Sequence, residues 1–206
     1  MEYSRLFTPI TIGGLTLKNR IVMPAMHHLY TENGYATPRF CRYYWDRVEG
    51  GAGLIIVGSC RFDDYGAKDN SMSLRTDDTI PGWREFTDGV HQRDGKVAVQ
   101  LYHAGRYMPK KDVPCGGDAL SPSATYASYT RETAPEMTRE QMFALLRDYA
   151  WLTVLYVTTG SLKSCCALYF VSAGVGTSSL YAEASYPSLV LSFGKEFPRT
   201  FGSDSR

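Results

Sequence analysis

Hydrophobic and polar positions alternate in the first part of the chain and then give way to continuous apolar runs. Residues 10–17 read ITIGGLTL, two short alternating runs around a Gly-Gly pair, and predict a β-hairpin. Residues 20–26, RIVMPAM, predict a first strand that ends at Pro24, because proline lacks the amide donor that a ladder needs. Residues 52–59, AGLIIVGS, are continuously apolar, as is typical of a strand buried on both faces.

Helix signals follow each of these apolar runs. Thr37 and Pro38 fit an N-cap followed by proline at the first helical position. Thr138 and Gln141 have the spacing of a capping box. The sequence therefore predicts helices over residues 37–49, 81–93 and 138–150.

The segment GKVAVQLYHAGRY, residues 95–107, joins a strand pattern to an unusually polar end. Apolar positions 97, 99 and 101 alternate with positions 98, 100 and 102, which is the period of a strand. If both faces of the sheet are covered, Gln100 lies inside the protein, where an unpaired amide costs about 1–3 kcal/mol. A partner for Gln100 is therefore expected, and the donors and acceptor of an amide suit the polar edge of a planar ring.

Strands and helices alternate through residue 150, which predicts an α/β fold with a parallel sheet and right-handed crossovers. In such folds, open or closed into a barrel, ligands bind at the carboxyl ends of the strands. Chemically unusual residues follow all three expected strands: Pro24, Ala25, Met26, His27 and His28; Gly58, Ser59 and Cys60; Gln100, His103 and Arg106. One site at this edge of the sheet is the prediction.

Composition limits the classes of function. The 206 residues, 44% hydrophobic and 21% charged, are enough for one soluble domain with a sizeable core. A formal net charge of +1 gives no electrostatic reason to expect nucleic acid or an acidic membrane as partner. The first residues, MEYSRLFTPI, lack a signal-peptide pattern, and the five cysteines show no zinc spacing. We expect free thiols and a cytoplasmic location.

Four segments resemble, in order, the motifs of the old yellow enzyme family of flavin oxidoreductases: LFTPITIGGLTLKNRIVMPAMH, YYWDRVEGGAGLIIVGS, VHQRDGKVAVQLYHAGRY and LSPSA. The third segment, and the Met-His pair after the first strand, are most similar to the 2,4-dienoyl-CoA reductase and enoate reductase branch. The resemblance covers about residues 5–150. It implies the N-terminal part of a (β/α)8 TIM barrel that is preceded by a β-hairpin.

The resemblance also implies a cofactor and its contacts. FMN would lie at the carboxyl face of the barrel, along Pro24, Ala25 and Met26. Gly58 would let the backbone approach the ring, and Gln100 would bond its pyrimidine edge. The family passes a hydride from NAD(P)H to the flavin and then to an activated alkene, such as an enone or an enoyl thioester, while an acid protonates the neighbouring carbon.

His27, His103 and Arg106 would shape the substrate rim, and His27 and His103 are the candidates for a catalytic role. Other interpretations remain open: a backbone partner for Gln100, core packing for Met26, Gly58 and His28, capping of the strand end by His103, and a carboxylate partner for Arg106. A metal is not expected, because adjacent histidines point in different directions and no third ligand is evident. The iron–sulfur motif of the related branch is not recognisable.

Residues 151–206 lose this pattern. They are serine-rich, have few charges and show no recognisable strand–helix alternation, and Lys163 interrupts their apolar stretch. We therefore expect two parts: residues 1–150, the N-terminal part of an FMN-binding barrel, and residues 151–206, a tail outside the family.

A barrel of this type needs about 250 residues, and the recognisable part supplies about three of its eight strands. We accordingly expect a truncated barrel with impaired FMN-dependent oxidoreductase activity. The alternative is a non-catalytic fragment that acts by pairing with another chain, for example as a homo-oligomer.

Overall fold

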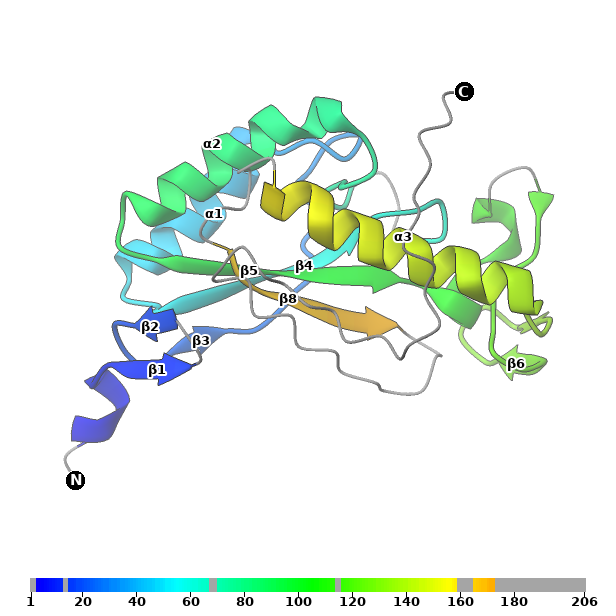
Figure 1. Ribbon diagram of the computed structural model, residues 1–206, viewed down its shortest axis with the longest axis horizontal. Coiled ribbons are helices and arrows are strands. Elements are labelled where there is room, and N and C mark those ends of the chain that lie inside the picture. The colour runs from blue at the N-terminus through cyan, green and yellow to red at the C-terminus, as the bar shows by residue number, and fades with distance from the viewer. Residues whose placement is uncertain (1–2, 13–14, 67–69, 114–115, 159–164, 173–206) are drawn as a thin grey trace.

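The computed structural model describes residues 3–12, 15–66, 70–113, 116–158 and 165–172 (Figure 1). In chain order the strands and helices are β1 (Ile10–Ile12), β2 (Leu15–Leu17), β3 (Val22–Met23), α1 (Pro38–Glu49), β4 (Leu54–Arg61), α2 (Ile80–His91), β5 (Lys96–His103), β6 (Thr125–Ala127), β7 (Glu132–Ala134), α3 (Arg139–Thr158) and β8 (Cys165–Ser172). Short 3-10 turns, including Gly105–Tyr107, lie between some of them.

The main sheet has four strands in the order β3-β4-β5-β8, and each neighbouring pair is parallel. Two antiparallel pairs, β1–β2 and β6–β7, stand apart from it. Figure 1 shows β1 and β2 near the amino ends of β4 and β5, and β6 beyond their carboxyl ends. The expected hairpin and parallel α/β sheet are confirmed.

The side chains that the sequence indicates as caps do cap the first turns of α1 and α3. The Thr37 hydroxyl accepts a hydrogen bond from the Phe40 amide at 3.1 Å, directly before α1. The Thr138 hydroxyl accepts from the Gln141 amide at 3.2 Å, and the Gln141 side chain accepts from the Thr138 amide at 2.8 Å. Both caps satisfy amides that have no partner within the helix, and the capping box before α3 is confirmed.

The expectation that strand–helix alternation stops at residue 150 is wrong. Helix α3 continues to Thr158, and β8 then pairs with β5 as a fourth parallel strand. The run CCALYFVS has no charged residue, and an uncharged run is compatible both with a strand of a parallel sheet and with a tail, so low charge did not distinguish the two. The division into two parts at residue 150 stays a prediction, and residues 173–206 lie outside the described residues. No helix in the described ranges combines the length and the apolar character that a membrane crossing requires.

The core lies between the sheet and the helices α1 and α2. Val97, Val99 and Leu101 of β5 are completely buried, as their alternation predicts. They share one cluster with Phe40, Tyr44, Val48, Ile55, Val57, Trp83 and Phe86. Each side chain of this size contributes about 1.5–3 kcal/mol when it is removed from water. This packing makes a rigid support for the strand ends.

Gly89 in α2 makes the contact with α1 possible. A Cβ atom at Gly89 would lie 2.3 Å from Cε2 of Trp45. The indole is held in place, because its Nε1 donates to the Phe86 carbonyl at 3.1 Å and Arg93 lies 4.7 Å above its ring. We expect Gly89→Ala to lower the free energy of unfolding by about 1–3 kcal/mol, as measured by urea denaturation.

Gly82→Ala, in the same helix, is the matched control. The atom nearest to a Cβ at Gly82 is the Ala36 Cβ at 3.7 Å, an ordinary contact distance. Since alanine is the better helix former, this variant should gain up to about 1 kcal/mol. Equal effects of the two substitutions would contradict the packing assigned to Gly89.

Candidate functional site

The loop after β3 touches β4 at one glycine. A Cβ at Gly58 would lie 2.5 Å from the carbonyl oxygen of Met26 and 2.6 Å from its amide nitrogen. Any larger residue would push the two backbones apart. The structure thus brings two of the predicted site residues together, and it gives Gly58 the packing role that the sequence left open.

Gln100 holds an irregularity in the neighbouring strand. The register between β4 and β5 shifts between Val57 and Cys60, and Ser59 has a left-handed backbone with φ of 56°. The Ser59 amide donates to Oε1 of Gln100 at 3.1 Å. The partner expected for this half-buried amide is therefore, for its oxygen, a neighbouring backbone group. No described residue accepts from its nitrogen, which leaves two donors for a ligand.

The loop itself is open to solvent. Pro24, Met26 and His27 are exposed and Ala25 is half-buried, so Met26 is not core filler. Nε2 of His27 lies 2.6 Å from the hydroxyl of the buried Ser71, and the two groups share a hydrogen bond. Loss of water around the ring lowers the pKa of His27, which keeps the ring uncharged at neutral pH.

His28 packs in a cluster of aromatic rings. Its ring centroid lies 4.4 Å from that of Tyr43 and 5.0 Å from that of Tyr44. Burial lowers the pKa of His28, and the neighbouring His27 and Arg47 act in the same direction. Among the described residues there is no group of three or more His, Cys, Asp or Glu side chains that could hold a metal ion.

His103 lies beneath the surface rather than on a rim. Its side chain is 0% exposed, and burial lowers its pKa to about 4. Its Nδ1 accepts a hydrogen bond from the Gly105 amide at 2.9 Å, and the Tyr65 ring stacks on it at 5.5 Å. This placement favours the alternative that His103 caps the end of β5.

Asp63 faces the other nitrogen of this histidine. Its Oδ2 lies 3.6 Å from Nε2 of His103, and its Oδ1 accepts from the Tyr65 amide at 2.9 Å. Because Nδ1 is an acceptor, the uncharged ring carries its proton on Nε2, toward the carboxyl group. Burial raises the pKa of Asp63 to about 7. Nothing in the segment RFDDYG marks this residue in the sequence, because its partner is forty positions away.

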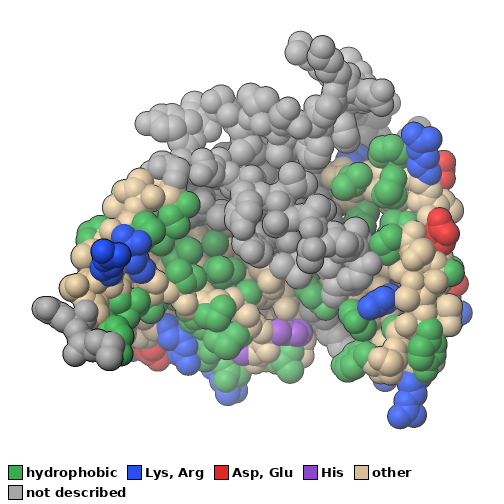
Figure 2. All heavy atoms as spheres, turned by 90° about the horizontal axis from the view of Figure 1, so that it is seen from below, with side chains coloured by type: hydrophobic (Ala, Val, Ile, Leu, Met, Phe, Trp, Pro, Cys, Tyr) green, Lys and Arg blue, Asp and Glu red, His purple; other side chains and the backbone are tan. Residues whose placement is uncertain are grey.

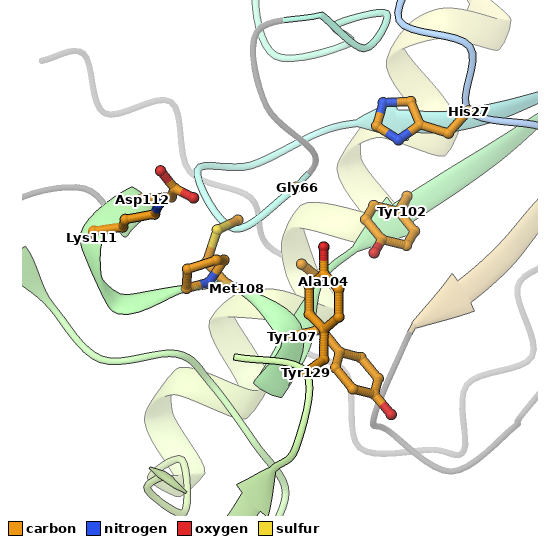
Figure 3. Close-up of a pocket in the computed structure, with 10 residues that line it drawn as sticks. His27, Gly66, Tyr102, Ala104, Tyr107, Met108, Lys111, Asp112 and Tyr129 are labelled. Atoms are coloured by element: carbon orange, nitrogen blue, oxygen red, sulfur yellow. The ribbon is translucent and has the colours of Figure 1, made fainter. Parts of the chain in front are cut away.

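A pocket of about 600 Å³ opens beyond the carboxyl end of β5 (Figure 3). Tyrosines from three segments line it: Tyr102 from β5, Tyr107 from the 3-10 turn and Tyr129 from the loop between β6 and β7. His27, Met108 and Lys111 are also in its wall. Figure 2 shows histidine atoms at the surface among hydrophobic side chains.

The sequence does not mark any of these three tyrosines as a site residue. Only Tyr102 had a usable signal, because it lies two positions after Gln100 and thus on the same strand face. Burial, followed by the proximity of Tyr129, raises the pKa of Tyr102, so its phenol keeps its proton at neutral pH. A phenol in this state donates a hydrogen bond to a carbonyl oxygen.

Arg106 contacts Tyr107 and is not itself among the residues that line the pocket. Its Nη2 donates to the Tyr107 hydroxyl at 3.1 Å, and its guanidinium lies 5.1 Å from the centre of that ring. Within the described part of the chain it has no carboxylate partner. The structure thus supports neither the ion pair nor direct lining of the pocket by Arg106, which instead orients Tyr107.

The sequence profile of the NADH:flavin oxidoreductase / NADH oxidase family matches residues 5–158. The chain belongs to this family. Its membership confirms the expected family, whose cofactors are FMN and NAD(P)H, and the match extends eight residues beyond the expected limit at residue 150.

Several relatives within the family share a third or more of their aligned residues with this chain. The "metal reductase" of Desulforamulus reducens is 40% identical over 147 residues, 71% of this chain and 22% of that protein. An NADPH dehydrogenase of Bacillus subtilis is 34% identical over 148 residues, 70% of this chain and 42% of the relative. The chain thus spans less than half the length of these relatives.

Solved structures agree on the fold. The Old Yellow Enzyme from Pichia sp. AKU4542 has a TM-score of 0.70 at 26% identity, over 82% of this chain and 46% of that one. Morphinone reductase in complex with tetrahydroNAD has a TM-score of 0.71 at 22% identity, over 80% of this chain and 48% of the other, and shows the fold alone. The expected N-terminal part of a TIM barrel is confirmed.

The described residues fit the edge of a flavin ring. Gln100 presents two amide donors whose direction is set by the bond from Ser59 to its oxygen. Gly58 keeps the backbone of Met26 next to β4, where a side chain would displace it. Pro24 and Met26 are exposed beside these groups, so a planar ligand can reach them.

The buried pair His103–Asp63 predicts an unusual dependence of stability on pH. The pKa of Asp63, raised from 3.8 to about 7, contributes stability that is present below pH 3.8 and lost as the pH rises through 7. The pKa of His103, lowered from 6.5 to about 4, contributes stability that is present above pH 6.5 and lost as the pH falls through 4. Between about pH 4 and 6.5 the two contributions oppose each other and cancel.

Asp63→Asn removes the first contribution. The unfolding free energy of the variant, relative to that of the unmodified chain, should therefore rise with pH by up to about 1.4 kcal/mol per unit between pH 4 and 7. Urea denaturation at four pH values measures this slope. Asp64→Asn is the control, because that side chain is 46% exposed and pairs with Arg75. If the unfolding free energies of Asp63→Asn and the unmodified chain changed with pH in parallel, the raised pKa of Asp63 would be refuted.

Proposed function

We propose that this chain provides the flavin-facing part of an FMN-dependent oxidoreductase that takes a hydride from NAD(P)H and reduces an activated C=C bond. The observation that carries the proposal is the arrangement of Gln100. Its oxygen is bound to Ser59, and its nitrogen, for which no described residue is an acceptor, remains available to donate to an acceptor such as a ring carbonyl. Family membership supplies the identity of the ring.

The chain's own residues would bind and orient the cofactor. Pro24, Ala25 and Met26 would lie along the ring, and Gln100 would donate to the carbonyl groups of its pyrimidine edge. Gly58 keeps the backbone of this loop close to the sheet. The flavin, when bound, supplies the hydride transfer, and the protein contributes its position and its surroundings.

The tyrosine-lined pocket would hold the second reactant. An enone or an enoyl thioester presents a carbonyl oxygen, to which the protonated phenol of Tyr102 can donate. Tyr107 and Tyr129 meet edge to face at 6.3 Å and give the pocket an apolar wall for a conjugated system. His27, neutral and bonded to Ser71, would stand at the rim as the remaining polar group.

Gel filtration of the full chain with excess FMN tests the proposal. The expected result is a protein peak that retains a flavin spectrum, which NADPH or NADH bleaches under anaerobic conditions and 2-cyclohexen-1-one restores. A colourless peak from a folded protein would overturn the proposal. Circular dichroism of the same fraction establishes whether the chain is folded.

Gln100→Met removes the side chain that would contact the flavin. The variant loses both outward donors and leaves the Ser59 amide without its partner, so we expect FMN to bind roughly 10–100-fold more weakly. Isothermal titration with FMN measures the change. Gln92→Met, at an exposed position after α2, is the matched control and should bind FMN with unchanged affinity. Equal affinities for the two variants would remove Gln100 from the flavin site.

A non-catalytic role through pairing with another chain is the second candidate. Within the described residues, β3 and β8 each pair with one neighbour only, so each leaves one edge of the sheet for a further strand. The column that tests flavin binding also measures size. A dimer without flavin would favour this candidate over the first.

A further inference from the structure

Residues 63–65 and residues 103–105, which lead into the wall of the pocket, contact each other around His103. The Ala104 amide donates to the Tyr65 carbonyl at 2.8 Å, and the Tyr65 amide donates to Asp63 at 2.9 Å. The Gly105 amide donates to Nδ1 of His103 at 2.9 Å. The bond from Ala104 to Tyr65, together with the stacking of the Tyr65 ring on His103, joins residues 63–65, which follow β4, to residues 103–105, which end β5; the other two bonds lie within one segment each.

Both segments continue directly into the pocket. Gly66 follows the first segment, and Ala104 and Tyr107 belong to the second; all three line the cavity (Figure 3). A Cβ at Gly66 would lie 3.3 Å from the Tyr102 carbonyl oxygen, so the two walls are already in close approach. A change in the hydrogen bonds between these two segments would therefore move the residues that line the pocket.

One buried hydrogen-bonding group between these two segments has no partner among the described residues. Nε2 of His103 is completely buried and has no hydrogen-bond partner among the described residues, although Oδ2 of Asp63 is 3.6 Å away. That distance is too long for a hydrogen bond. A short movement of the carboxyl group would close it, and an ionised carboxylate would make the stronger, charge-assisted bond.

We propose that Asp63 and His103 form a proton-controlled clasp: the ionised Asp63 accepts the Nε2 proton of His103 in a hydrogen bond and holds the turn Gly105–Tyr107 in place, and protonation of Asp63 releases it. Both are positioning residues, since neither lines the pocket. The inference rests on the proposed function only for what the pocket binds.

The charges around Asp63 set the range in which the clasp works. Burial is the main cause of its raised pKa of about 7; Asp148 of α3 and the adjacent Asp64 raise it further, and Arg75 lowers it. His103, with a pKa of about 4, stays uncharged over the same range. Of these two groups, only Asp63 changes charge between pH 6 and 8, and its side chain, 13% exposed, can exchange protons with water.

Amide hydrogen exchange of the full chain, followed by NMR, tests the clasp. The Gly105 amide reports it directly, because its bond to His103 breaks when the turn is released. After correction for the intrinsic rate, we expect its protection to rise about tenfold from pH 6 to pH 8, with a midpoint near 7. A flat profile in the unmodified chain would overturn the proposal, whatever the variants do.

Two variants identify the group that titrates. Asp63→Asn should give low protection of Gly105 at every pH. Asp64→Asn should retain the step, because its exposed side chain lies outside the clasp, with the midpoint moved to lower pH because Asp64 no longer raises the pKa of Asp63. A step that persists in Asp63→Asn would overturn the proposal. If that variant does not fold, loss of the step in Asp64→Asn would do so equally. FMN is absent from all these measurements, so failure of flavin binding leaves the test intact.

Discussion

The contact between the backbones of Gly58 and Met26 controls how closely the loop after β3 approaches the parallel sheet. A Cβ atom at position 58 would lie 2.5 Å from the Met26 carbonyl oxygen, closer than non-bonded atoms approach, so the contact exists only because the residue is glycine. The contact also fixes where the residues of the loop are exposed. Pro24, Met26 and His27 are exposed beside the strand ends instead of away from them.

The same glycine begins the irregular part of β4, and this irregularity explains a polar residue in an apolar strand. At Ser59 the backbone turns left-handed and its amide is released from the regular ladder. Gln100 satisfies that amide with its oxygen, which offsets a cost of about 1–3 kcal/mol for a buried unpaired donor. The structural role and the proposed flavin contact therefore use opposite ends of one amide group and do not compete.

Burial explains the chemistry on the far side of β5 in a similar way. Asp63 and His103 are both largely buried, and burial shifts the pKa of each in the direction that favours its uncharged form. An ion pair there would lose hydration on both members, which its attraction seldom repays. A single proton on Asp63 is then sufficient to change the bonding behind the tyrosine-lined wall.

The sequence by itself determined the hairpin, the starts of α1 and α3 and the parallel direction of β3, β4 and β5, because caps, turns and periodicity act between near neighbours. It also placed Gln100 and the loop at Met26 at the strand ends, and motifs identified the family. Only the tertiary structure decided that β8 joins the sheet, that His103 is buried against Asp63, and that three tyrosines share a pocket. These features depend on contacts between distant segments, where burial and hydrogen bonding are set by the packing of the whole and leave no local pattern.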